Sequence, residues 1–496
     1  MKARLPHRFF IYASQFTTKS MIKAVSYWAF ETFKNPQDKL KYISRREKYE
    51  IDIGGKTIRN EVMLVQNWLV DMIYVLACHP SLGKKEISQT QALHLIALYN
   101  DYDNLLDSKR INQDNVLLYV LGAFGEQFRF QNPQSYMGEF SREKYILDNI
   151  SYKSEKAAVY NIDVKKEFFD ITGFTTDEYP ALVFALWGLF SQKSPFASKP
   201  LKVIEYKDTV FSIDNMMKVL SNYTINFNDI INSPLERQVF YTKPIVEFDD
   251  EYVCTNPLLL LALFTNCIYW CLRNKYFVKG SQDFINAFGC YFETYVDELL
   301  ENTLDKKNYK RLSETDKEKR ADLYIKLGEY EFIVEQKSAL SSLRVKQSHP
   351  DIEEMKKHFI KTWGKAIEQL ESTQKYLKLS NPIKIILIYE DYYKGNMLKQ
   401  FFDVCPEYKN DNKYWLVSIT EFETLLQLYR SSPGQALKII KEKDEAHSSP
   451  VPGKIDLSQF FSEENVNQNQ YLINHKIYDE EFDYMRKLCQ KIDFSL

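Results

Sequence analysis

The stretch Ala321–Ser338, ADLYIKLGEYEFIVEQKS, decides the fold expected for this chain. In its first half apolar residues alternate with polar ones, which is the pattern of a half-buried strand. The apolar positions, all on one face, are Leu323, Ile325 and Leu327. Gly328-Glu329 then fits a two-residue loop with Gly at its first position. Because Tyr330–Lys337 completes the return strand, the sequence predicts a β-hairpin here.

The register of this hairpin places two carboxylates opposite each other. If Leu327 faces Tyr330, then Asp322 faces Glu335, and facing residues share one side of the sheet with Cβ atoms roughly 5 Å apart. Carboxylates so close repel each other unless a cation lies between them. A bound divalent metal ion is the usual cation in such a position. Lys337 points to the same side as Glu335 and would reach the same reaction centre. The alternative is an ordinary surface hairpin with charged residues on its wet face.

Composition limits the function classes open to the chain. Its 496 residues and 45% hydrophobic content predict about two to four domains with ample apolar core. The formal net charge of -2 provides no overall basic field, so any contact with nucleic acid must be local or assisted by metal.

Cysteine usage and hydropathy predict a cytoplasmic protein without a membrane span. The seven cysteines are an odd number and form no CxxC pair, which favours a reduced protein over a disulfide framework or a zinc site. The most apolar run, Pro257–Leu272, has only 16 residues and includes Thr265 and Asn266, so we expect a buried helix. The basic start lacks the apolar stretch of a secretory signal.

Residues 1–245 are expected to form a mainly helical region. Asn60–Ala77 and Glu86–Asn100 both carry apolar residues at the spacing of three and four that is typical of helices. The many aromatic residues indicate core filling, with base stacking or a partner surface as the alternative. No motif in this region indicates a particular reaction. The hypothesis for it is a role in sensing, in binding a partner or in binding DNA. Residues 246–279 are expected to form a connecting helix.

A second helix, residues 281–304, precedes the hairpin. Its aromatic stripe is flanked by Glu293, which would point into a site at the edge of the sheet or, alternatively, into solvent. Lys306–Arg320 follows and is strongly basic, with Tyr309–Leu312 as a candidate first strand. This segment is either a phosphate-contacting loop or the solvated tip of a charged hairpin.

The chain after the hairpin alternates between helices and strands. The expected elements are a helix at Asp351–Lys378 with Gln369 near its apolar edge, a buried parallel strand at Ile383–Tyr389, a helix at Met397–Val404, a strand at Tyr414–Ile419 and a helix at Glu421–Tyr429. This order predicts an α/β core with a mixed sheet flanked by helices. Residues 431–496 are expected to form loops, at 431–434 and Glu442–Lys454, and a tail with a candidate helix at Asp479–Lys491.

Residues 280–430, about a third of the chain, resemble the PD-(D/E)XK nuclease superfamily, whose fold is that of restriction endonucleases. Asp322 takes the place of the motif aspartate, although Ala321 stands where the literal motif has Pro. Glu335-Gln336-Lys337 matches the second motif. Glu293 is similar to the helix carboxylate of many members, and Gln369 to a polar residue on the helix that follows the motif.

The resemblance implies a metal-dependent deoxyribonuclease. Asp322, Glu335, the carbonyl of Gln336 and Glu293 would bind one or two Mg²⁺ or Mn²⁺ ions through oxygen ligands. The metal would lower the pKa of bound water and neutralise charge on the scissile phosphate. Lys337 would orient the attacking water or stabilise the phosphorane, and the products would carry a 5′-phosphate and a 3′-hydroxyl.

The same resemblance implies DNA as the partner and leaves other partners open. A nuclease joined to a large helical region looks like bacterial restriction or anti-phage defence proteins, which is an analogy at the level of fold. Such proteins act as homodimers in some cases and need a second defence-system protein in others. Two alternatives remain: a nuclease-like fold that binds nucleic acid or a partner without cutting, and a nuclease directed at RNA.

Overall fold

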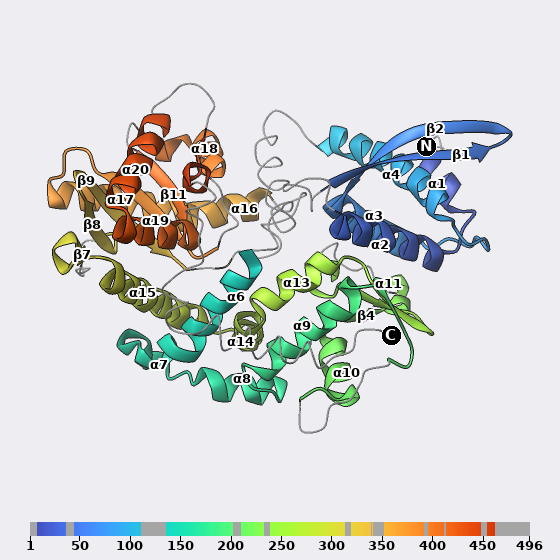
Figure 1. The fold of residues 1–496 in the computed structure, drawn as a ribbon, viewed down its shortest axis with the longest axis horizontal. Helices are drawn as coiled ribbons and strands as arrows, with labels where there is room; N and C mark the ends of the chain where they lie inside the picture. Colours follow the sequence, from blue (N-terminus) through green and yellow to red (C-terminus); the bar gives the residue numbers. More distant parts are fainter. Residues whose placement is uncertain are drawn as a thin grey trace.

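The computed structural model shows a mixed α/β protein in which helices flank mixed sheets, as the sequence predicts (Figure 1). In Figure 1 the larger sheet lies at the left and the N-terminal hairpin at the upper right. The structure describes residues 7–35, 44–110, 135–201, 210–232, 239–312, 319–338, 340, 352–390, 395–410, 413–447 and 454–461.

The larger sheet has five strands in the order β11-β10-β9-β8-β7. The strands are β7 (Tyr309–Arg311), β8 (Leu323–Leu327), β9 (Tyr330–Lys337), β10 (Ile383–Ile388) and β11 (Tyr414–Ser418). The first three pair antiparallel, whereas β9, β10 and β11 run parallel. The predicted mixed sheet and its buried parallel strand, β10, are therefore confirmed.

The hairpin of β8 and β9 has the predicted register. Leu327 pairs with Tyr330, and Leu323 pairs with Val334, so the next pair outward is Asp322 and Glu335. Gly328 opens the turn at φ 60°, a backbone conformation that favours glycine. The local chemistry of the turn therefore determines which side chains meet at the far end of the hairpin.

Each face of the five-stranded sheet is covered by its own helices. On one face Ile385 and Leu387 of β10 belong to a core shared with α15 (Asp283–Thr303), α19 (Ile419–Ser431) and α20 (Pro433–His447). On the other face Ile386 and Ile388 belong to a second core. That core includes α16 (Ile352–Phe359), a π-helical turn (Ile360–Gly364), α17 (Lys365–Leu377) and α18 (Gly395–Val404). Burial on both faces explains why β10 is apolar almost throughout.

The loops predicted at 431–434 and Glu442–Lys454 are both wrong in part, because α20 spans Pro433–His447. Ala436, Ile439 and Ile440 are buried at helical spacing, and Lys443 lies over the Trp415 ring at 4.7 Å from its centroid. These tertiary contacts stabilise a helix that its charged sequence does not indicate. The candidate helix at Asp479–Lys491 lies outside the described residues.

The N-terminal region is mainly helical, as predicted. Its helices are α1 (Arg8–Ala13), α2 (Thr18–Lys34), α3 (Gln66–Cys78), α4 (Gln89–Arg110), α6 (Ser135–Tyr145), a π-helical turn (Ile146–Ile150), α7 (Ser151–Lys153), a 3₁₀ helix (Glu155–Tyr160), α8 (Val164–Thr172), α9 (Glu178–Ser191), α10 (Ile213–Asn222), α11 (Phe227–Asn232) and α12 (Val239–Thr242). The region also contains strands that the sequence analysis did not predict. They are β1 (Ser44–Ile53), β2 (Lys56–Val65), β3 (Phe196–Ser198), β4 (Thr224–Asn226) and β5 (Ile245–Glu247), and the last three form a sheet with β6 (Glu251–Cys254).

The helix predicted at Asn60–Ala77 is wrong in its first third. Residues through Val65 belong to β2, and the helix begins at Gln66. Gly54 and Gly55 both have positive φ, at 58° and 77°, so they form a tight turn that pairs β2 with β1. The short apolar run at the end of β2 is compatible with the periodicity of a helix and with that of a strand. Pairing with β1 makes it a strand.

One apolar core runs from the N-terminal helices to the five-stranded sheet. It includes Met72 of α3, Leu260 of α13 (Pro257–Thr265), Phe292 of α15 and Leu387 of β10. The connecting helix predicted for residues 246–279 is wrong in its first part, which contains strand β6. The rest forms two helices, α13 and α14 (Cys267–Val278), of which α13 is almost entirely buried. Among the described residues no helix is long and apolar enough to cross a membrane, and the six described cysteines are free.

A buried ion pair joins the N-terminal region to the α/β core. Arg142 of α6 donates to both carboxylate oxygens of Glu423 in α19, at 2.7 and 2.8 Å, and also to Thr420 at 2.7 Å. Tyr295 of α15 donates to the same carboxylate at 2.5 Å. The two charged side chains are only 3% and 2% exposed. Buried charges of this kind depend on their partners for stability.

Arg142→Leu should lower the free energy of unfolding by about 3–5 kcal/mol, because it leaves the carboxylate of Glu423 buried without its cation. Denaturant titration of the full chain measures this loss. The double variant Arg142→Leu/Glu423→Leu should recover much of it, since no buried charge remains. Arg59→Leu, which removes an exposed pair with Glu50, serves as the control and should change stability by less than about 1 kcal/mol. A double variant as unstable as the single one would contradict this account.

Candidate functional site

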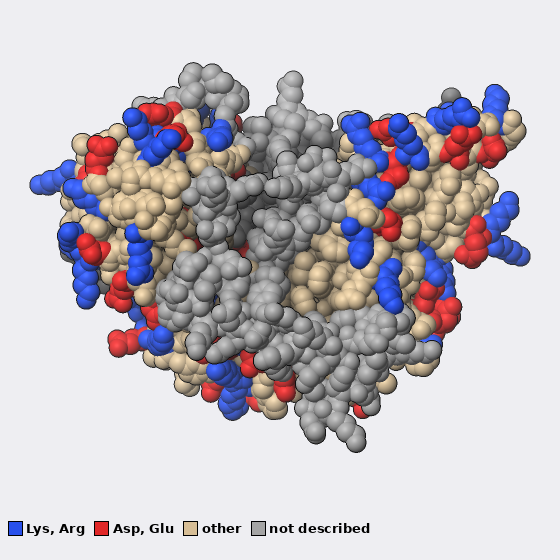
Figure 2. Space-filling model, in the orientation of Figure 1, with Lys and Arg blue, Asp and Glu red and all other residues tan. Residues whose placement is uncertain are grey.

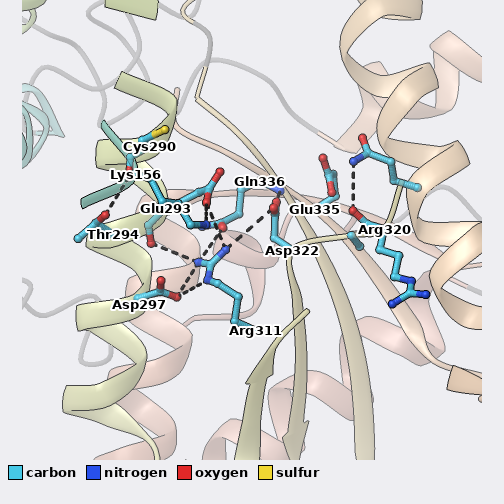
Figure 3. Close-up of polar contacts among 12 residues, drawn as sticks. Lys156, Cys290, Glu293, Thr294, Asp297, Arg311, Arg320, Asp322, Glu335 and Gln336 are labelled. Atoms are coloured by element: carbon cyan, nitrogen blue, oxygen red, sulfur yellow. Dashed lines mark hydrogen bonds and ion pairs between the residues drawn. The ribbon is translucent and has the colours of Figure 1, made fainter. Parts of the chain in front are cut away.

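Asp322 and Glu335 lie at neighbouring ends of β8 and β9, between α15 and α17 (Figure 3). Glu335 is 3% exposed and the side chain of Asp322 is 23% exposed. The main-chain N–H of Gln336 donates to Oδ2 of Asp322 at 2.7 Å. The structure therefore brings together the two carboxylates and the glutamine that the sequence analysis selected.

The main chain of Gln336 faces Asp322. The carbonyl of the next residue, Lys337, accepts from the N–H of Tyr389 at 3.1 Å and so points toward β10. Because successive residues of a strand direct their N–H and C=O groups to opposite neighbours, those of Gln336 point the other way, toward β8. The carbonyl predicted to serve as a metal ligand thus lies on the Asp322 side of β9.

Lys337 is held by a glutamate and a glutamine. Its Nζ lies 2.6 Å from Oε1 of Glu335 and donates to Oε1 of Gln369 at 3.2 Å. The Nε2 of Gln369 donates in turn to the main-chain carbonyl of Arg320 at 3.2 Å. Gln369, the polar residue that the resemblance singled out on this helix, therefore ties the lysine to the chain that enters β8.

Thr373 fastens the same helix to the start of β8. Its Oγ1 accepts from the main-chain N–H of Ala321 at 2.7 Å. Since Thr373 follows Gln369 by one helical turn, both side chains project from one face of α17. Helix α17 thus holds the ends of β8 and β9 together, which fixes the spacing of the site residues.

Glu293 reaches the edge of the site from α15, where two cations contact it. Nζ of Lys156 lies 2.6 Å from its Oε2, and Nη1 of Arg311 lies 3.6 Å from the same atom. Lys156 belongs to the 3₁₀ helix Glu155–Tyr160, so the N-terminal region contacts a candidate site residue directly. The negative charge of Glu293 is therefore already compensated by protein side chains.

Arg311 lies among the acidic groups of the site, and the sequence analysis did not select it. Its Nε and Nη2 contact Oδ1 of Asp297 at 2.8 and 2.6 Å, and Nη2 donates to Oε1 of Gln336 at 3.2 Å. Its Nη1 lies 4.0 Å from Oδ1 of Asp322. Figure 3 shows the guanidinium between the helix that carries Glu293 and the strand end that carries Asp322.

The sequence contained a signal for these missed residues. Asp297 follows Glu293 by four positions, which places both on one face of α15. Arg311 pairs with Leu323 on the neighbouring strand, and Asp322 is the residue directly before Leu323. The two residues are therefore diagonal neighbours in the sheet. Finding the contact required the register of β7, which the short strand at Tyr309–Arg311 does not determine by pattern alone. Nothing in the sequence around Lys156 distinguishes it from an ordinary surface lysine or indicates its contact with Glu293.

Burial controls the charge of the site. It raises the pKa of Asp322 to about 6; the Gln336 N–H opposes this shift, the neighbouring charge of Glu293 adds to it, and Arg311 and Lys337 oppose it. Burial also raises the pKa of Asp297 in spite of Arg311. A strongly shifted carboxyl beside other charged groups is common at functional sites.

The donor set suits a hard divalent cation bound through two carboxylates. Among the described residues, no group of three or more His, Cys, Asp or Glu side chains is arranged to hold a metal. Mg²⁺, however, is commonly bound through one or two carboxylates, with waters completing its shell. Asp322 and Glu335 supply oxygen donors of that type, and a cation beside Asp322 would relieve the cost of its buried charge.

Charges of both signs are interspersed over the described parts of the face in Figure 2. This agrees with the formal net charge of -2 and with the expectation that any contact with nucleic acid is local. Only residues 313–318 of the segment predicted as a phosphate-contacting loop lie outside the described residues. Its described part forms a 3₁₀ helix (Lys306–Asn308) and β7, and Arg320 at its end places its guanidinium 3.6 Å from the centroid of the Tyr376 ring.

Comparison of the chain with protein-family models, curated proteins and solved structures found no match. The function of this chain is therefore inferred from the geometry of the site and from its resemblance to a known family in motif and order of elements.

Asp322→Asn should stabilise the metal-free protein increasingly as the pH rises. Because the folded-state pKa of Asp322 is raised to about 6, the folded protein keeps a proton that the unfolded chain loses, and wild-type stability falls as pH rises from about 4 through 6. Asparagine still accepts from Gln336 but has no charge to bury. The gain should reach at most about 3 kcal/mol near pH 8.

Urea unfolding in EDTA between about pH 4 and pH 8 measures this difference. Asp249→Asn, at an exposed position, is the matched control and should show no such trend. A gain for Asp322→Asn that does not change with pH would show that burial of its charge is not the cause.

Proposed function

We propose that this protein is a Mg²⁺- or Mn²⁺-dependent nuclease that hydrolyses phosphodiester bonds of DNA. The observation that carries the proposal is the Asp322–Glu335 pair at adjoining strand ends, with Nζ of Lys337 2.6 Å from Oε1 of Glu335. Carboxylates and a lysine that converge at the edge of a sheet are the parts that metal-assisted phosphodiester hydrolysis needs.

Asp322 and Glu335 would hold the cation, together with the main-chain carbonyl of Gln336. When bound, such an ion activates water and neutralises charge on the scissile phosphate. Asp322 has to be ionised to bind it, and the cation itself favours that state. The Gln336 N–H keeps the Asp322 carboxylate in place through a hydrogen bond to one of its two oxygens.

Lys337 would act on the reacting phosphate. Its ammonium group has three donors, of which Glu335 and Gln369 receive two. The third is available to orient the attacking water or to stabilise negative charge on the phosphorane. Because Gln369 is itself anchored on the carbonyl of Arg320, the lysine is fixed before substrate arrives, which is the preorganisation that electrostatic catalysis requires.

The proposed setting is cytoplasmic defence against foreign DNA, of the restriction or anti-phage kind. The large N-terminal region would sense DNA or a partner, and it has a physical route to the site through the contact of Lys156 with Glu293. Homodimerisation and a second defence-system protein belong to this proposal as ways to license cutting. The defence setting is an analogy of fold and architecture.

A second candidate is a nuclease-like protein that binds nucleic acid or a partner without cutting. It is favoured by the pairing of Glu293, Asp297 and Glu335 with cationic side chains, which stabilises the acidic groups without a metal. An RNA-directed nuclease would use the same site, so the choice of nucleic acid has to come from the assay.

Lys337→Ala and Glu335→Gln should each reduce cleavage by at least about 100-fold, because each removes a charged group from the reacting centre. Supercoiled, linear and single-stranded DNA and single-stranded RNA, each with Mg²⁺, Mn²⁺ or EDTA, are the substrates to compare. EDTA should abolish cutting by the wild type. Lys326→Ala, an exposed lysine on the same hairpin, is the matched control and should cut normally.

Cleavage that persists in both variants would contradict the assignment of the site. Cutting of RNA alone would change the substrate from DNA to RNA and leave the site unchanged. If the wild type binds nucleic acid but cuts none of these substrates, the binding protein is the better description.

A further inference from the structure

We propose that Arg311 is a built-in cation that limits the candidate site to one divalent ion. The inference rests on the function proposed above and concerns the acidic side of the site, where Glu293, Asp297 and Asp322 surround a single guanidinium (Figure 3). A residue in this place determines how many metal ions the site can take, and hence which kind of hydrolysis it performs.

The contacts of Arg311 place a positive charge among the oxygens that a second ion would need. Two of its nitrogens converge on Oδ1 of Asp297 at 2.6 and 2.8 Å, and Nη2 also donates to the carbonyl of Glu293 at 3.3 Å and to Oε1 of Gln336 at 3.2 Å. Nη1 lies 3.6 Å from the carboxylate of Glu293 and 4.0 Å from that of Asp322. The guanidinium therefore lies between the carboxylates of Glu293 and Asp322, which a second cation would need as ligands.

The charge of Arg311 is permanent and its position is fixed. Arginine does not lose its proton in proteins, so no pH change opens this position. The residue is part of β7, where it pairs with Leu323, and its side chain is only 23% exposed. In two-metal sites the ions lie about 4 Å apart and share a carboxylate. Beside Asp322 a second divalent ion would meet the positive charge of Arg311 at close range.

The balance of charge supports one ion rather than two. Four carboxylates and three cationic side chains lie in the site and, with every carboxyl ionised, leave one net negative charge. They are Glu293, Asp297, Asp322 and Glu335 on one side, and Lys156, Arg311 and Lys337 on the other. One divalent ion makes the site singly positive, which matches one phosphodiester group. Lys156 adds to the effect, because its contact at 2.6 Å engages Glu293, the further carboxylate that the resemblance offers as a ligand.

The number of bound ions tests the inference. Titration of the full-length protein with Mn²⁺, followed by calorimetry and by the electron paramagnetic resonance signal of free Mn²⁺, should find one ion per chain for the wild type. Arg311→Gln should bind two, the second more weakly, and the two ions should show the spectral broadening of a coupled pair. Arg311→Lys keeps the charge and should bind one. Arg59→Gln, at an exposed arginine paired with Glu50, is the matched control and should also bind one.

Each result has a distinct meaning. Two ions in the wild type, or one ion in a folded Arg311→Gln protein, would overturn the inference while the proposed function stands. The wild-type count tests the inference even if the variant fails to fold, as circular dichroism would show. Glu335→Gln should lose the single ion. A wild type that binds no Mn²⁺, or a Glu335→Gln protein that binds it normally, would refute the proposed metal site and this inference with it.

Discussion

The two-residue turn at Gly328 fixes the pairing of β8 and β9, and the rest of the site depends on that register. A shift of one residue would move every side chain of β9 to the opposite face of the sheet. Glu335 and Lys337 would then face α15, and Gln336 would face α17. With the observed register, α17 receives the glutamate and the lysine, whereas the side chain of Gln336 meets Arg311 on the other face.

Electrostatic compensation is the second constraint on this chain. The acidic groups of the site are partly compensated by side chains from three different parts of the sequence, namely Lys156, Arg311 and Lys337. The buried pair of Arg142 and Glu423 follows the same logic at the junction of the two regions. Together with the continuous apolar core, these pairs make the N-terminal helices part of the structure that holds the site.

The sequence predicts those parts of the fold that depend on short-range pattern. The hairpin, its register and the buried strand β10 are recognisable because alternation, a Gly turn and an apolar run broken only by Lys384 each act within a few residues. The β1–β2 hairpin and helix α20 were missed, since a partner strand and packing against Trp415 decide them. Arg311 was missed for the same reason, because its role arises only when β7 pairs with β8.

The π-helical turn Ile360–Gly364 has a consequence for Gln369, which lies in the α17 helix that follows it. Such a turn usually contains one residue more than an α-helical turn, as a single-residue insertion leaves behind. One residue corresponds to about 100° of rotation in an α-helix. A relative of this protein that lacks the extra residue would therefore present a different face of α17 to Lys337. The phase of one helix, rather than the identity of a side chain, would then decide whether the lysine is anchored.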